Sequence, residues 1–245
     1  MPERPERSNL KRNVDAFNRD AAEGQYAYTR QERVSSRMSN ARMSDAILGA
    51  TDFAGRTVLD IGCGDGLYTL ELARAGAVQV TGIDPAPNAI ALATEKAAAA
   101  GAHNVTFRVA DVDALKGGPR FDIVVFRGVL HHLRDPASAV HIAGGLCRQM
   151  VILEPNGLNP ILKVIERVSP YHVEHEEQSY TPRTLKEWIG AAGGHTAKLQ
   201  IMNLVPMFCP SWAARICKTL EPVVESIPGL RAVACGQFVV LAEFR

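Results

Sequence analysis

The chain has 245 residues, 47% of them apolar, and its 27 basic and 26 acidic residues leave a net charge of +1. This length and apolar content suit one globular α/β domain with a modest additional element, and they argue against two full domains. Proteins that bind nucleic acid usually carry a basic excess because they neutralise phosphates, and no such excess is present here. We therefore expect a small-molecule partner and no nucleic-acid partner.

The cysteines and the apolar stretches indicate the cellular compartment and whether the chain crosses a membrane. The cysteines are odd in number and lack the short paired spacings of a tetrahedral zinc site; they are Cys63, Cys147, Cys209, Cys217 and Cys235. Residues 1–12 are rich in Pro, Glu and Arg and do not resemble a signal peptide. Prolines and basic residues interrupt the apolar stretch 201–220, so we do not expect it to span a bilayer. A cytoplasmic protein without an integral membrane segment is expected, and the sequence leaves monomer and homodimer open.

The first predicted elements are two helices, at 9–20 and 31–48, which precede any strand. From Thr57 onward, short β-rich runs alternate with helix-forming stretches, a pattern typical of parallel strands joined by right-handed helical crossovers. The predicted strands are 57–61, 79–83, 105–109, 122–126 and 150–153. The helices predicted between them are 67–75, 88–100 and one running from Pro136 towards Cys147.

The last third of the chain predicts a helix and two late strands. The helix covers 182–192, with Thr181 as its cap and Gly193 and Gly194 at its end. The strands, 195–203 and 233–244, are expected to pair antiparallel, and apolar residues between 216 and 227 at near-helical spacing predict a cover helix. Core packing is expected for a further apolar group, with an apolar acceptor pocket as the alternative; the group is Met202, Val205, Met207, Phe208 and Trp212. No basic amphipathic face favours contact with a membrane surface.

A glycine-rich turn follows the first predicted strand and opens a helix. Its glycines are Gly62, Gly64 and Gly66, and their spacing differs from the Gly-x-Gly-x-x-Gly of dinucleotide sites. Glycines let a ligand approach the backbone closely. Asp60 stands at the mouth of the turn, where a carboxylate would repel a pyrophosphate and suit an ammonium group. Cys63, between two glycines, is expected to fill the turn rather than to act as a reactive thiol.

Two further carboxylates follow the next two strands. Asp84 lies 18 residues after Gly66 and ends the second strand, where a carboxylate can accept two hydrogen bonds from a ribose diol. Asp111 follows the third strand, where it could accept a hydrogen bond from an adenine amine while the N–H of Val112 donates another. A single carboxylate at a strand end is usually a helix cap or a solvated strand end. Their order and spacing together favour a nucleoside site.

The segments from 57 to 154 resemble the class I S-adenosylmethionine-dependent methyltransferases. The resemblance implies a Rossmann-like, doubly wound and mainly parallel seven-stranded sheet, and S-adenosyl-L-methionine as cofactor. It implies that the three glycines line the methionine moiety, that Asp60 lies by the amino group, that Asp84 holds the ribose, and that Asp111 and Val112 hold the adenine. The remaining candidate cofactor contacts are Cys63, Pro85, Arg127 and Tyr26. A nicotinamide-dependent oxidoreductase, which the glycine spacing disfavours, and a non-catalytic methyltransferase-like binding subunit are the rival interpretations.

Two histidines follow the fourth strand, at the edge where α/β sheets bind ligands. The stretch Leu130-His131-His132-Leu133 resembles that of methyltransferases of quinone biosynthesis and of natural-product sugar O-methylation. The resemblance implies that His131, His132 and the later Glu154 assist deprotonation of the acceptor, a task that histidine suits near neutral pH. The alternative is that one histidine packs or caps the next helix. We expect O-methylation first and C- or N-methylation next.

The predicted organisation is an N-terminal helical lid at 1–50 and a methyltransferase core at 51–245, with substrate cover at about 155–181 and 204–230. The lid would bring Tyr26 or Tyr28 to the mouth of the site, with ordinary packing as the alternative. The candidate substrate contacts are Tyr28, His172, His175 and Tyr180. Residues 171–177 match no metal motif, so a solvated loop over the substrate pocket and no metal are expected. Arg127 is expected to pair either with an acidic substrate or with Asp111.

Overall fold

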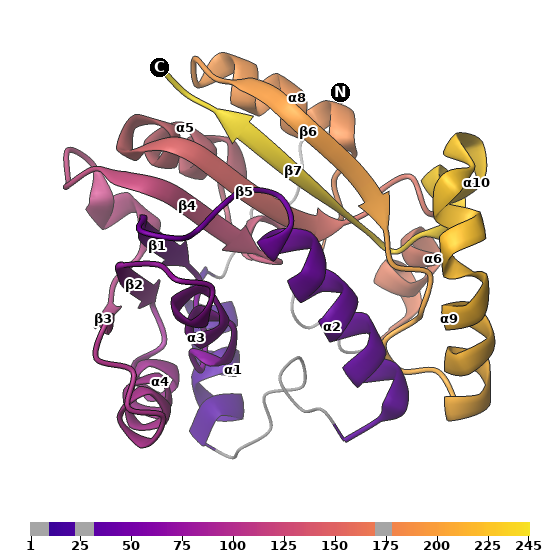
Figure 1. Ribbon diagram of the computed structural model, residues 1–245, viewed down its shortest axis with the longest axis horizontal. Coiled ribbons are helices and arrows are strands. Elements are labelled where there is room, and N and C mark those ends of the chain that lie inside the picture. The colour runs from indigo at the N-terminus through magenta and orange to yellow at the C-terminus, as the bar shows by residue number, and fades with distance from the viewer. Residues whose placement is uncertain (1–9, 23–31, 170–177) are drawn as a thin grey trace.

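The computed structural model describes residues 10–22, 32–169 and 178–245. Its strands form one sheet in the order β3-β2-β1-β4-β5-β7-β6 (Figure 1). The pairs from β3 through β5 are parallel, whereas β7 runs antiparallel to both of its neighbours. The strands are β1 Thr57–Ile61, β2 Gln79–Asp84, β3 Val105–Val109, β4 Phe121–Arg127, β5 Cys147–Pro155, β6 His195–Met202 and β7 Gln237–Glu243. The predicted doubly wound, mainly parallel seven-stranded sheet is confirmed.

Helices cover both faces of this sheet, because its central strands are apolar on both sides. Leu59 and Val124 belong to a core closed by α5 and α8, whereas Val58 and Val125 face the opposite core, closed by α2 and α3. The helices are α1 Leu10–Ala22, α2 Val34–Leu48, α3 Leu67–Arg74, α4 Pro87–Ala99, α5 Pro136–Leu146, α6 Pro160–Val168, α8 Pro182–Ala191, α9 Ser211–Ser226 and α10 Pro228–Ala234. Two 3₁₀ turns, η1 Val112–Leu115 and η2 Leu130–His132, follow β3 and β4.

Two elements differ from the sequence-based expectation. The last strand begins at Gln237 and not at 233, because Pro228 opens the short helix α10, which runs to Ala234. The segment between β5 and α8 contains α6, for which the sequence pattern predicts no helix. Its cap is Asn159, whose side chain accepts hydrogen bonds from two backbone N–H groups of the first turn. Asn followed by Pro is a helix-start signal that explains this element.

The apolar group around the β6–α9 connection divides between core and surface. Met202 and Val205 are buried, as core packing requires, but Phe208 and Trp212 are 50% and 68% exposed. The core-packing expectation is therefore wrong for these two aromatic residues. Among the described residues, no helix is long and apolar enough to cross a membrane.

Candidate functional site

The glycine turn joins β1 to α3 and lies against the ends of β2 and β4. Gly62, Gly64 and Gly66 all have positive φ, the region that favours glycine. The backbone N–H groups of Gly62 and Cys63 both donate to the Ile83 carbonyl, at 2.8 and 3.0 Å. A Cβ at Gly62 would lie 2.5 Å from Cγ2 of Val129, so this position has no room for a side chain. Burial raises the pKa of the Cys63 thiol above its ordinary value, which agrees with an unreactive turn residue.

Asp84 is the last residue of β2, and its side chain accepts a hydrogen bond from the glycine turn. One carboxylate oxygen accepts the Gly64 N–H at 3.0 Å and the other accepts the Ala86 N–H at 2.9 Å. Burial raises the pKa of this carboxyl group despite both hydrogen bonds. Because each carboxylate oxygen has two lone pairs, both oxygens retain capacity to accept from a ligand diol.

Asp111 lies beside Asp84, because the Ala110 N–H donates to the Asp84 carbonyl at 3.1 Å. Its negative charge contributes to the raised pKa of Asp84. The Asp111 side chain accepts a 3.4 Å hydrogen bond from the Asp113 N–H and so caps η1, while Val112 is buried. Asp111 therefore both caps η1 and lies next to Asp84, so the helix-cap role does not exclude a role in the site. The carboxylates that the sequence assigns to one nucleoside site are therefore neighbours.

Asp60 lies near the end of β1 and opens onto a cleft. Its Oδ2 accepts the Thr69 hydroxyl at 2.6 Å, and burial raises its pKa to about 6. The cleft also contains a guanidinium, so opposite charges face the same space. Its lining residues are Ser44, Ile47, Leu48, Asp60, Tyr68, Glu71, Leu72, Val125 and Arg127.

Arg127, the last residue of β4, turns towards α2 and α3. Its guanidinium carbon lies 3.4 Å from the centroid of the Tyr68 ring, and it donates to the Ser44 hydroxyl at 2.9 Å and the Asn40 carbonyl at 3.2 Å. A carboxylate oxygen of Glu71 is 3.8 Å away. These partners are not Asp111, so the pairing with Asp111 that the sequence leaves open is not the one observed.

Glu154 and His131 form a buried pair at the neighbouring ends of β5 and β4. The His131 ring nitrogen Nδ1 lies 2.7 Å from Oε2 of Glu154, whose side chain is fully buried. The other carboxylate oxygen, Oε1, accepts the backbone N–H groups of Val129 and Leu130, at 2.9 and 2.8 Å. One carboxylate thus holds both the backbone and the histidine of the turn after β4.

The other predicted active-site residues within the described part of the chain contact groups other than Glu154. The His132 ring lies 4.0 Å from the His131 ring, centroid to centroid, and it is His131 that contacts Glu154. Tyr180 packs edge-on against Trp188 at 4.8 Å, and its carbonyl accepts the Gly157 N–H just after β5. The remaining candidates, Tyr26, Tyr28, His172 and His175, lie outside the described residues.

Sequence reasoning missed the residues that surround Arg127. Tyr68 and Glu71 lie three residues apart on α3, directly after the glycine turn, and Asn40 and Ser44 lie four apart on α2. Residues at these spacings share one helix face. The spacing is visible in the sequence, but nothing there shows that both faces meet the end of β4.

Comparisons with known proteins agree with this architecture. A family model described as a methyltransferase domain matches residues 58–149. A ubiquinone biosynthesis O-methyltransferase of Methylobacterium sp. (strain 4-46) is 44% identical over 97 residues, which cover 39% of this chain and 38% of that protein. One from Xanthomonas euvesicatoria pv. vesicatoria (strain 85-10) is 30% identical over 176 residues, which cover 67% of this chain and 71% of that protein. The chain thus spans well under two thirds of the first relative and more than two thirds of the second.

A solved structure also resembles the whole fold. Magnesium protoporphyrin IX methyltransferase from Synechocystis PCC 6803, with bound SAH, superposes with a TM-score of 0.68 at 19% identity. The match covers 95% of this chain and 98% of that one. At this identity the likeness concerns the fold alone.

Proposed function

Because the chain belongs to the class I S-adenosylmethionine-dependent methyltransferases, we propose that it methylates an oxygen atom of a small-molecule acceptor, with His131 as general base. The buried pair of His131 and Glu154 carries this proposal. An ionised carboxylate only accepts hydrogen bonds, so Nδ1 of the imidazole carries the hydrogen and the basic lone pair lies on Nε2. Family membership removes the nicotinamide-dependent oxidoreductase as a rival.

The residues of the cleft and turn fit the cofactor chemically. Asp60 and Arg127 present opposite charges to one cleft, as the ammonium and carboxylate of an aminoacyl group require. Asp84 retains acceptor capacity for a ribose diol beyond its two hydrogen bonds to backbone N–H groups. We assign the methionine moiety to the Asp60 and Arg127 end of the site and the nucleoside to Asp84, Asp111 and Val112.

The cofactor, when bound, supplies an electrophilic methyl group on a sulfonium sulfur, which leaves as a neutral thioether. What the protein adds is alignment of the acceptor and removal of its proton. His131 Nε2 takes that proton, and Glu154 stabilises the imidazolium that forms because it already holds Nδ1 at 2.7 Å. His132 is assigned a secondary role beside it, in shaping the site.

The helices outside the sheet complete the proposed domain organisation. Within the N-terminal lid at 1–50, α2 supplies Ser44, Ile47 and Leu48 to the cleft wall. The cover comprises α6 after β5 and α9 with α10 between β6 and β7. Tyr180, at the end of the segment that follows β5, is assigned to the acceptor side.

The proposal is tested by methyl transfer from labelled S-adenosylmethionine to a panel of small phenols, hydroxyquinones and sugars, with the methylated atom located by NMR. The ubiquinone biosynthesis activity of the relatives supports including hydroxylated quinone precursors. His131→Ala should abolish most turnover while leaving cofactor affinity nearly intact. Methylation at carbon or nitrogen, or turnover unchanged in His131→Ala, would refute the oxygen-transfer and base assignments respectively.

Calorimetric titration with S-adenosylmethionine separates two explanations of an inactive panel. Saturable binding that Asp84→Ala weakens would support the proposed cofactor position and direct the search to other acceptors. Binding that Asp84→Ala leaves unchanged would contradict the ribose assignment. Binding without turnover on any acceptor would favour the alternative of a non-catalytic methyltransferase-like binding subunit.

A further inference from the structure

Helices α9 and α10 expose a continuous apolar face. On α9, positions four, four and three residues apart point one row of large side chains to solvent, and α10 extends the row. We call this row the α9–α10 stripe; it consists of Trp212, Ile216, Leu220, Val223, Ile227, Leu230 and Val233, each between 42% and 68% exposed. Single exposed apolar residues are ordinary, but a row of this length marks an interaction surface.

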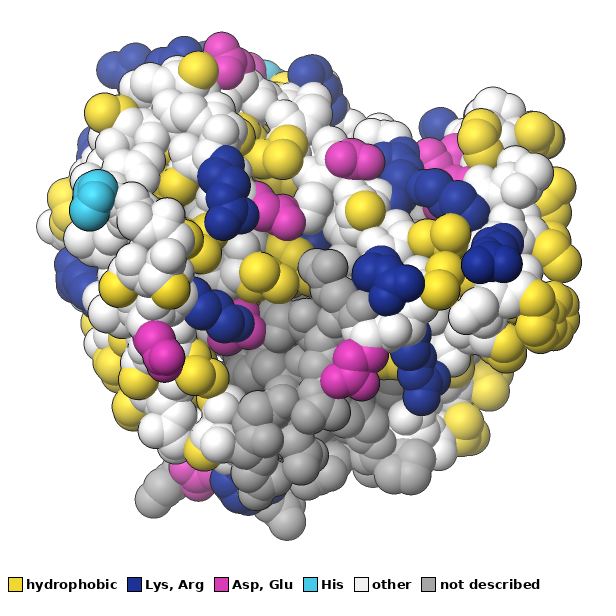
Figure 2. Space-filling view, turned by 60° about the horizontal axis from the view of Figure 1, so that its bottom comes forward, with side chains coloured by type: hydrophobic (Ala, Val, Ile, Leu, Met, Phe, Trp, Pro, Cys, Tyr) yellow, Lys and Arg dark blue, Asp and Glu magenta, His cyan; other side chains and the backbone are white. Residues whose placement is uncertain are grey.

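Helix α6 adds a second apolar row at the same end of the molecule. Ile161, Val164 and Val168 are 66%, 56% and 69% exposed, and no residue of α6 is buried. The side-chain amides of Asn156 and Asn159 donate to carbonyl groups of α10, which holds the start of α6 against that helix. The three helices therefore lie together at one end (Figure 1), and apolar side chains gather on that side of the surface (Figure 2).

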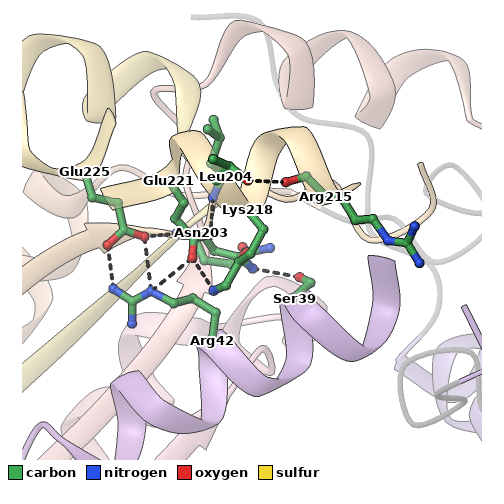
Figure 3. A network of polar contacts seen from close by, with 10 residues as sticks. Ser39, Arg42, Asn203, Leu204, Arg215, Lys218, Glu221 and Glu225 are labelled. Atoms are coloured by element: carbon green, nitrogen blue, oxygen red, sulfur yellow. Dashed lines mark hydrogen bonds and ion pairs between the residues drawn. The ribbon is translucent and has the colours of Figure 1, made fainter. Parts of the chain in front are cut away.

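The acidic side chains of α9 are turned into the protein. Glu225 accepts from Arg42 of α2 at 2.6 and 3.1 Å and from the Asn203 N–H at 2.8 Å (Figure 3). Glu221 is 3% exposed, accepts the Leu204 N–H at 3.1 Å and pairs with Lys218. Both carboxylates of α9 are therefore paired within the protein and do not present negative charge to solvent.

The basic side chains of the same helices remain accessible. Arg215 extends away from the interior network (Figure 3) and is exposed, as is Arg167 on α6. The side chains of Lys218 and Lys163 are 41% and 36% exposed, whereas that of Glu166, the acidic residue of α6, is only 14% exposed. Lys218 and Lys163 pair with Glu221 and Glu166, so the accessible positive charge beside the apolar rows comes from Arg215 and Arg167. The sequence alone indicates no basic amphipathic face, because composition does not show which charges turn inward.

We propose that α6 and the α9–α10 stripe dock the protein onto an anionic lipid surface. Helices that lie in a membrane interface combine an exposed apolar face with lysine and arginine beside it, and anionic headgroups attract those charges. A second copy of the chain fits less well, because a contact between two such faces would bring positive charges together, whereas the acidic side chains of α9 are turned inward and cannot pair with them. Trp212, the most exposed residue of the stripe, has the amphipathic ring that favours the headgroup level.

Sedimentation with vesicles tests the proposal on the full chain. Vesicles of phosphatidylcholine alone are compared with vesicles of equal parts phosphatidylcholine and phosphatidylglycerol. The wild type should sediment with the anionic vesicles, and Trp212→Ser combined with Ile216→Ser and Leu220→Ser should weaken binding by about tenfold or more. Val78→Ser is the matched control, because Val78 is 58% exposed but lies between α3 and β2, and its binding should equal that of the wild type.

Charge reversal separates the electrostatic contribution. Arg167→Glu with Arg215→Glu should weaken binding to anionic vesicles by about tenfold and remove most of its salt dependence. Arg74→Glu, an exposed position at the end of α3, serves as the control and should change neither. Thermal unfolding of every variant confirms that it is folded, which is expected because all the changed side chains are exposed.

Three results would overturn the proposal. The first is absence of wild-type binding to anionic vesicles, and the second is equal binding by the stripe variant and the wild type. The third is a dimer in sedimentation equilibrium that the stripe variant abolishes, without vesicle binding, which would assign this face to a second copy.

Discussion

Glu154 holds His131 through one carboxylate oxygen and the backbone of the same turn through the other. The two residues meet because β4 and β5 are adjacent and parallel, so residues at or just after their carboxyl ends share one edge of the sheet. A single side chain therefore controls both the orientation of the imidazole and the path of the chain that carries it. These two tasks can be separated by substitution.

Glu154→Gln should preserve the fold and remove the base. The amide oxygen of Gln can still accept the two backbone N–H groups, but its NH₂ would face Nδ1 of His131 and favour the wrong tautomer. We expect turnover to fall by about 10²- to 10⁴-fold with little change in S-adenosylmethionine affinity. Steady-state kinetics and calorimetry check this, and a loss confined to cofactor affinity would contradict it.

Glu154→Ala should also destabilise the protein. It leaves the Val129 and Leu130 N–H groups without their buried acceptor, at a cost of about 2–6 kcal/mol in unfolding free energy. Urea titration of Glu154→Ala and Glu154→Gln side by side measures the difference. Equal stability of the two variants would show that the carboxylate does not anchor this turn.

The sequence predicted the parallel half of the sheet well. Predicted strands at 57–61 and 105–109 match β1 and β3 residue for residue, because both are short runs rich in β-branched residues, although β1 is buried and β3 is a largely exposed edge strand. The last strand was harder, because Val233 and Ala234 at the end of α10 are apolar like β7 itself, and only Cys235 and Gly236 separate the two elements.

The candidate site was predictable in its residue types and less so in its contacts. Asp60, Asp84 and Glu154 stand at or near strand ends, and this position alone predicts that they share one edge of a parallel sheet. The sequence did not show that Arg127 turns towards α2 and α3, because the direction of a side chain at a strand end depends on helices distant in sequence. It also did not show that Glu221 and Glu225 of α9 point inward.

The ionisation of Asp60 should appear in the pH dependence of stability. Its pKa rises from the ordinary value of 3.8 to about 6 on folding, so the folded state binds this proton more tightly than the unfolded chain. Its contribution to unfolding free energy therefore decreases as pH rises between these two values and is constant above them. Asp60→Asn should stabilise the protein by up to about 3 kcal/mol at about pH 7.5 and by little at about pH 4. Thermal unfolding at both pH values checks this, and equal effects at both would refute it.

The same titration should govern cofactor binding. If ionised Asp60 holds the aminoacyl ammonium, wild-type affinity for S-adenosylmethionine should weaken as pH falls below about 6. Asp60→Asn should bind more weakly at neutral pH and show little pH dependence across this range. Calorimetry over a pH series compares the S-adenosylmethionine affinity of the wild type and of Asp60→Asn. If the affinity of Asp60→Asn also depends on pH, the titrating group is not Asp60.

The glycine turn should reject side chains for two separable reasons. Gly62→Ala places a Cβ at positive φ and also 2.5 Å from Val129, so we expect a loss of about 2–4 kcal/mol in unfolding free energy and weak cofactor binding. Gly101 has a φ of +63°, and nothing lies within 4 Å of the point that a Cβ would occupy, so Gly101→Ala should lose only about 1–2 kcal/mol and bind cofactor normally. Adding Val129→Ala should partly restore Gly62→Ala. Equal losses at the two glycines would show that strain alone matters.

The ion pair between α2 and α9 should matter more than a pair on the surface. The Arg42 and Glu225 side chains are 16% and 15% exposed and make two hydrogen bonds, so Arg42→Met leaves a carboxylate largely buried without its cation. We expect a loss of about 3 kcal/mol in unfolding free energy.

Arg183→Met is the matched control for this pair. Arg183 and Glu187 are 88% and 62% exposed, and their ion pair has a single 3.0 Å contact. Water and salt screen such a pair, so its loss should change stability by at most about 0.5 kcal/mol. Because α2 also holds Arg127 through Asn40 and Ser44, Arg42→Met should in addition weaken S-adenosylmethionine binding, whereas Arg183→Met should not. Chemical denaturation and calorimetry of both variants decide the matter, and equal losses would mean that burial does not strengthen the α2–α9 contact.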